Sequence, residues 1–175
     1  MHQAITELVA EHDAILTALR LLERLAAHAQ RHGHAAGETD ELLGFFREFL
    51  DRCHHGKEET LLFPAMLAAG LASHGGFVDE LHAEHVEGRA RLAALAQAAT
   101  PAAFAAAVAD YAALLRAHID KENAVFFPMA ERLLGAATLA ELQRGFAAHE
   151  RQVLGTGRHA ELHALLQRLQ ARYPA

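Results

Sequence analysis

The chain has 175 residues, of which 52% are hydrophobic, carries a net charge of −6 with its histidines neutral, and contains a single cysteine, Cys53. This composition indicates a globular domain rather than a disordered chain. The acidic balance argues against nucleic acid or an anionic membrane as a partner. One cysteine permits no internal disulfide, the N-terminus is unlike a signal peptide, and no apolar run reaches the roughly 18 residues of a membrane span, so we expect a cytoplasmic protein.

The first two predicted elements are amphipathic helices. Apolar residues recur at three- and four-residue steps over residues 5–22, which indicates a helix with one buried face. Gly33 and Gly37 mark a loop, and Thr39 or Asp40 can cap the helix that follows. This second helix runs through Leu50 into a polar motif.

Two further helices follow the glycine-rich break at residues 70–76. The third is predicted over residues 77–95, and the fourth begins at Pro101, a residue favoured in the first turn of a helix. The apolar stripe of the fourth helix is regular from Phe104 to Met129. Four long helices joined by short loops predict an all-α protein, an antiparallel up-down-up-down four-helix bundle.

The last part of the chain extends beyond this bundle. We assign the bundle to residues 1–135 and a C-terminal helical hairpin to residues 136–175. Such a hairpin would pack on the bundle or form the interface of a homodimer.

A motif occurs twice in the sequence, 64 residues apart. Residues 53–64 read "CHHGKEETLLFP" and residues 117–128 read "AHIDKENAVFFP". The shared positions are His54/His118, Lys57/Lys121, Glu58/Glu122, Phe63/Phe127 and Pro64/Pro128. In each copy the histidine and the glutamate are four residues apart, so they share one helix face.

Two further histidines lie inside the apolar stripes of the other helices, His12 in the first and His85 in the third. One such histidine is most simply a buried imidazole paired with a neighbour. Four histidines and two glutamates facing one core are different, because a buried carboxylate without partners costs several kcal/mol. A pair of metal ions would offset that cost. Histidine and carboxylate together favour iron, and zinc or manganese are possible substitutes.

His12, "HHGKEETLLFP", His85 and "HIDKENAVFFP" together resemble the hemerythrin-like, HHE cation-binding family over roughly residues 5–133. The resemblance implies a four-helix bundle holding an oxo- or hydroxo-bridged pair of iron ions. It implies the metal ligands His12, His54, Glu58, His85, His118 and Glu122, with both glutamates bridging.

The motifs depart from those of the oxygen-carrying hemerythrins on the third and fourth helices. Leu81 stands four residues before His85, where the carriers have a histidine, and Asn123 stands five residues after His118, where they have an aspartate. The pattern is more similar to a branch that includes iron–sulfur repair proteins. Simple oxygen transport is therefore disfavoured.

Each iron would have five ligands: two histidines, two bridging carboxylates and a bridging oxygen. One octahedral position therefore stays open on each metal. That favours reaction with peroxide, O2 or NO in oxidative or nitrosative stress, and we favour catalase-like peroxide disposal. The alternatives are an iron, O2 or NO binding or sensing module, or iron–sulfur cluster repair, without turnover. NO or O2 turnover would need an electron donor, and the sequence does not identify one.

Several neighbours of the predicted ligands carry separate expectations. His55 and Glu59 are expected to point about 100° away from the ligands, toward solvent or behind them. His82, three residues before His85, is a candidate fifth histidine ligand. Lys57 and Lys121 are expected at the surface, paired with acids.

Four other residues could shape the site. Tyr111 should share a layer with Leu19, Phe46 and Leu92 and could hydrogen-bond toward the metal site. Gly88, one turn after His85, allows close helix packing or room for a ligand. Pro64 and Pro128 should kink or end their helices.

Overall fold

The computed structural model describes residues 1–33 and 35–174, which are helical apart from short connections and contain no strand. The elements in chain order are α1 (Gln3–His32), α2 (Ala36–Phe45), η1 (Phe46–His55), η2 (Glu58–Leu62), α3 (Phe63–Ala68), α4 (Phe77–Ala96), α5 (Pro101–Lys121), η3 (Glu122–Phe126), α6 (Phe127–Leu133), α7 (Ala136–Leu154) and α8 (Arg158–Arg172). The three η elements are π-helical. Pro101 occupies the first turn of α5, and the Thr100 hydroxyl accepts a hydrogen bond from the Ala103 amide.

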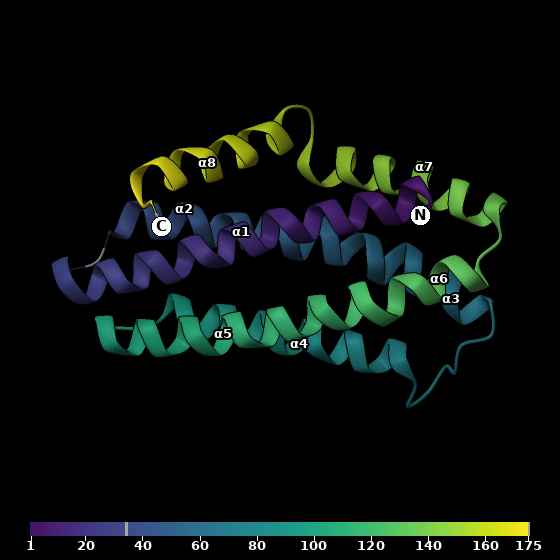
Figure 1. Cartoon of the computed structure of the whole chain (residues 1–175), viewed down its shortest axis with the longest axis horizontal. Coiled ribbons are helices and arrows are strands. Elements are labelled where there is room, and N and C mark those ends of the chain that lie inside the picture. Colours follow the sequence, from purple (N-terminus) through teal and green to yellow (C-terminus); the bar gives the residue numbers. More distant parts are fainter. Residues whose placement is uncertain (34, 175) are drawn as a thin grey trace.

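These elements form the predicted four-helix bundle with a C-terminal helical extension (Figure 1). The second long helix consists of α2, η1, η2 and α3, and the fourth consists of α5, η3 and α6. Contacts of α1 with α5, of α5 with α4, of α4 with η1 and of η1 with α1 close the ring of four. The fold class predicted from the helical periodicity is confirmed.

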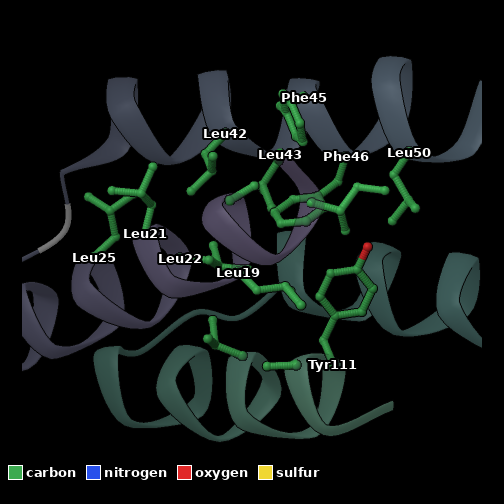
Figure 2. Close-up of a cluster of buried hydrophobic side chains, with 14 of the residues drawn as sticks. Leu19, Leu21, Leu22, Leu25, Leu42, Leu43, Phe45, Phe46, Leu50 and Tyr111 are labelled. Carbon is green, nitrogen blue, oxygen red and sulfur yellow. The ribbon is translucent and has the colours of Figure 1, made fainter. Parts of the chain in front are cut away.

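The hydrophobic core is divided into two clusters. One cluster contains Leu19, Phe46, Leu92 and Tyr111, the layer predicted from the helix stripes. Figure 2 shows Leu19, Phe46 and Tyr111 of this cluster. The other contains Ile5, Leu8, Phe63, Phe126 and their neighbours. On α1, His12 lies between Leu8 of the second cluster and Ile15 of the first, so a polar layer separates the two halves of the core.

Neither Pro64 nor Pro128 ends its helix. Each follows a π-helical turn, in which the amide of Phe63 donates to the carbonyl of Glu58 and the amide of Phe127 donates to that of Glu122, five residues back. The wider turn carries the chain past a residue that has no N–H to donate. The helices therefore continue through both prolines, and the predicted stop is replaced by a local change of helix type.

The C-terminal helices α7 and α8 lie one after the other along the bundle, not side by side as the hairpin expected from the sequence (Figure 1). α7 contacts α1 and η1, and α8 contacts α1 and α2. Phe146 of α7 and Leu166 of α8 are buried in the second and first core clusters, respectively. Gly155 and Gly157 adopt φ values of 72° and 89°, which other residues rarely adopt, and lie in the short connection between the two helices. The homodimer interface stays a prediction.

One helix meets the length and composition of a membrane span, contrary to the expectation that none would. It runs over Pro101–Leu133. A core helix of a bundle passes the same test, and this one carries the buried polar residues His118 and Glu122. The match is therefore weak evidence for a membrane span.

We expect Phe146→Ala to lower the free energy of unfolding by about 3–5 kcal/mol, because the fully buried ring would leave a cavity between α7 and the bundle. Urea denaturation of the protein measures the change. Val86→Ala, at an exposed position, is the control and should cost far less. Equal stability of the two variants would contradict the packing of α7 on the bundle.

Candidate metal centre

The four helices bring together the six residues predicted as metal ligands. His12 comes from α1, His54 from η1 and His85 from α4, and each is 1% exposed. The other three are also buried, His118 on α5 and the two glutamates, Glu58 and Glu122, each at the first position of a π-helical turn. The polar layer between the two core clusters is thus built from these six side chains.

The four histidines form two close pairs. His12 Nε2 lies 3.0 Å from His54 Nε2, and His85 Nε2 lies 3.1 Å from His118 Nε2. Burial lowers the pKa of all four imidazoles, that of His118 to about 3, so the rings are neutral. Each Nδ1 is bonded to a side-chain oxygen, as described below, and so carries the ring proton. Both Nε2 lone pairs of a pair therefore face each other, an arrangement that a cation between them would stabilise.

The two glutamates connect the histidine pairs. Glu58 Oε1 lies 3.7 Å from His54 Nε2, and its Oε2 lies 3.5 Å from His85 Nε2. Glu122 Oε2 lies 3.2 Å from His12 Nε2 and 3.3 Å from His118 Nε2. Each carboxylate thus reaches one histidine of either pair, the arrangement expected of a ligand that bridges two metal ions.

The four glutamate oxygens have no hydrogen-bond partner among the described residues. Burial raises the pKa of both carboxyl groups well above the usual range, and for Glu58 the nearby Glu122 raises it further. Leaving such groups unpaired in a core is costly. The donor set, neutral imidazole with bridging carboxylate, fits a pair of divalent or trivalent cations.

The potential ligand atoms of the polar layer fall into two groups, in each of which they lie within 4.8 Å of one another. One group is His12, His54, Glu58 and Glu122, and the other is His55, Glu58, His85 and His118. Glu58 belongs to both, which again indicates two adjacent metal positions.

The sequence comparison decides what kind of centre this is. Residues 3–130 match the family described as the hemerythrin HHE cation-binding domain. The chain belongs to this family. A search of curated proteins found no match. Hemerythrin domains bind metal ions, typically iron, and the buried His and Glu cluster fits such a metal site.

In this hemerythrin domain each histidine pair is held in place from behind. His54 Nδ1 donates to Glu11 Oε2 at 2.8 Å, and the other Glu11 oxygen accepts from Lys57. A carboxylate behind a ligating histidine fixes its tautomer and orientation and raises its basicity. Lys57 also donates hydrogen bonds to Glu7 and to Glu150, and Glu150 lies on α7. The C-terminal extension, beyond the family match, thus reaches the support of His54.

The second half of the duplicated motif repeats this contact. His118 Nδ1 donates to Glu84 Oε2 at 2.8 Å, and Glu84 accepts from Lys121. Glu11 and Glu84 immediately precede His12 and His85 in the sequence. The repeated Glu-His dipeptide was the available signal for these two carboxylates, and we assigned them no role from sequence.

The remaining histidines have different partners. His85 Nδ1 donates to Glu59 Oε1 at 2.8 Å, and Arg89 also donates to that oxygen. Burial raises the pKa of Glu59, but these hydrogen bonds lower it more, to about 2 overall. Glu59 thus lies behind a ligand, one of the two places expected for it. His12 Nδ1 donates to Asn123 Oδ1 at 2.9 Å, so the residue that differs from the oxygen carriers supports a histidine here.

Several expectations for neighbouring residues are corrected. Lys57 is fully buried, not at the surface, because α7 covers it. His82 is exposed and takes no part in the cluster. His55, expected to point away from the ligands, is buried beside them. Cys53 is buried, and burial raises the pKa of its thiol to about 12, which makes it unreactive.

Tyr111 lies in the first core cluster rather than among the ligand atoms. Its ring packs edge-on against Phe46 with 5.4 Å between centroids, and Figure 2 shows the hydroxyl directed toward the helix that carries Leu50. It lines a cavity of about 10 Å³ with His55 and Gly88. The only side chain that a Cβ on Gly88 would contact is Leu114, at a distance of 4.0 Å. Close helix packing therefore does not require a glycine here.

The two equivalent lysines give a matched test of the supports. Lys57→Met would leave Glu11 as an uncompensated buried charge, and we expect it to lower the free energy of unfolding by about 3–5 kcal/mol. Lys121→Met removes the partly exposed counterpart and should cost about 1 kcal/mol or less. Urea denaturation of both variants compares them directly. The argument fails if Lys121→Met is the more damaging change.

Proposed function

We propose that this hemerythrin-like protein binds two iron ions and disposes of peroxide in a catalase-like reaction. The observation that carries the proposal is the pairing of the histidines, with two buried glutamates each reaching across both pairs. That arrangement suits two ions rather than one. Zinc or manganese fit the same donors and are the expected substitutes.

Burial prepares the histidines for metal binding. The imidazoles stay neutral because burial lowers their pKa, so the Nε2 lone pairs need no deprotonation before binding. Burial raises the pKa of the two glutamates, so these would release their protons as cations bind and would then supply the negative charge. The carboxylates Glu11, Glu59 and Glu84 hold the rings in position from outside.

A pair of ferric ions supplies redox chemistry that converts peroxide into O2 and water without an external reductant. NO or O2 turnover would instead need an electron donor, so peroxide is the simpler substrate for this chain. A hydrogen-bonded series also joins the centre to the edge of the bundle. His54 Nδ1 bonds Glu11, Glu11 bonds Lys57, and Lys57 bonds Glu150, which is partly exposed. Such a series can carry protons between a buried site and solvent.

Tyr111 is proposed to affect the reaction only indirectly. It borders the small cavity beside His55, so its hydroxyl can influence the centre through whatever occupies that cavity. The cavity is about the size of one water molecule.

The second candidate is a module that binds or senses iron, O2 or NO, or that repairs iron–sulfur clusters. The enclosure of the centre favours it, because the six ligands lie between two hydrophobic clusters and are nearly inaccessible. Such a site admits a diatomic molecule more readily than a large substrate. For either candidate we propose a cytoplasmic protein.

We expect purified protein to contain two irons per chain and to show the charge-transfer absorption of a bridged ferric pair. His54→Ala, Glu58→Ala, His118→Ala and Glu122→Ala should each lose metal, because each removes a ligand and leaves others unpaired. Elemental analysis and an optical spectrum measure both properties. His82→Ala, at an exposed position, should keep both irons. One zinc and no iron, in protein produced with ample iron, would refute the di-iron proposal.

We expect the iron-loaded protein to evolve O2 from hydrogen peroxide, measured with an oxygen electrode. The reference is Glu58→Ala, in which one bridging carboxylate of the centre is removed. Tyr111→Phe should lower the rate while keeping two irons. If the iron-loaded protein is no faster than Glu58→Ala, peroxide disposal is wrong, and the binding or sensing function becomes the better account.

A further inference from the structure

We propose that His55 is a third histidine ligand on the His85–His118 side of the centre, which makes the two metal positions unequal. This inference rests on the proposed di-iron function. The resemblance to known hemerythrins did not assign His55 a role, and the candidate fifth histidine from sequence, His82, is exposed.

His55 is buried and unpaired. It is 2% exposed, and neither ring nitrogen has a hydrogen-bond partner among residues 1–33 and 35–174. The four other histidines of the centre each bond a side chain through Nδ1. An unpaired imidazole beside them requires an explanation.

The position of the ring points to one side of the centre. His55 stacks on His85 with 3.7 Å between ring centroids and 13° between planes, and lies edge-on to His118 at 5.7 Å. One of its nitrogens lies within 4.8 Å of ligand atoms of Glu58, His85 and His118. Ligand atoms about 2.1 Å from a shared metal lie at most about 4.2 Å apart. Small side-chain shifts would therefore complete the group.

The helix type explains how two consecutive histidines can both face the core. In an α-helix, His54 and His55 would project about 100° apart. They end the π-helical segment η1, where the Gly56 amide donates to the Asp51 carbonyl five residues back. A turn with more residues rotates each one by less, so neighbours lie closer to one face. Single π-helical turns of this kind are frequent at functional sites.

The alternative roles for the ring account for it less well. Asp51 Oδ1 is 3.8 Å from His55 Nδ1, too far for a hydrogen bond, and that oxygen already accepts from Arg89 Nε at 2.6 Å. The cavity of about 10 Å³ beside Tyr111 has room for about one water, which would satisfy one ring nitrogen. The other nitrogen would still lack a partner, and metal ligation supplies one.

Three histidines on one metal and two on the other predict one available position rather than two. An external ligand would then bind on the His12–His54 side. This changes the substrate geometry, because a two-atom ligand would attach to a single metal instead of spanning the pair.

The first test counts ligating histidines in the unaltered protein. In the reduced di-iron form, each ring bound through one nitrogen and protonated at the other gives a strongly shifted, solvent-exchangeable N–H signal by NMR. We expect five such signals. Four signals in protein that holds two irons would overturn the assignment of His55 while leaving the proposed di-iron centre intact. Protein that binds no iron would overturn both.

The second test uses a variant that keeps the ring shape. His55→Phe preserves stacking on His85 but removes both nitrogens, and His82→Ala is the exposed control. Mössbauer spectra of protein loaded with iron-57 should show two unequal iron sites in the unaltered protein and in the control. In His55→Phe the two sites should become alike, and azide binding should rise from one to two per iron pair. Unchanged spectra and azide stoichiometry in a two-iron His55→Phe would refute the proposal.

Discussion

Two carboxylates without protein partners sit at the centre of this bundle, and the rest of the structure is arranged around that constraint. Glu58 and Glu122 are fully buried with all four oxygens unpaired by the described residues. Leaving two such groups unpaired in a core is costly, and cations bound between them would offset that cost. The division of the hydrophobic core into two clusters follows from the same constraint, because the polar layer must cross the whole bundle to collect ligands from every helix.

The supports around the centre show how charge is balanced from the inside outward. Neutral histidines face inward, carboxylates stand behind three of them, and a lysine or arginine stands behind each carboxylate. The carboxylates orient the histidines, and the lysines and the arginine offset the charge of the carboxylates. The exception is His12, whose partner Asn123 is an uncharged amide. The charged residues thus extend well beyond the predicted ligands, and most of them lie within the part of the chain that matches the family.

The bundle and the set of six inward-facing residues could be predicted from sequence, because both follow from the regular spacing of apolar and ligand residues on α-helices. The places where prediction failed are those where spacing is not the deciding factor. His55 faces the core because η1 is π-helical, and no residue pattern in the sequence indicated that helix type. Lys57 is buried because α7 packs over it, a contact between residues 93 positions apart. Pro64 follows a π-helical turn instead of ending its helix. The spacing of apolar residues does not reveal which carbonyl each backbone amide bonds, so this turn could not be predicted.

Helix α7 reaches the support of one histidine pair and not that of the other, and this makes its detachment selective. Glu150 contacts Lys57, and through Glu11 that contact reaches His54, whereas Lys121 bonds two carboxylates of α4 and is partly exposed. Transient opening of α7 would hydrate the buried support of His54, while the support of His118 already meets solvent. Detachment of α7 would therefore change the surroundings of the His12–His54 pair and leave those of the His85–His118 pair as they are.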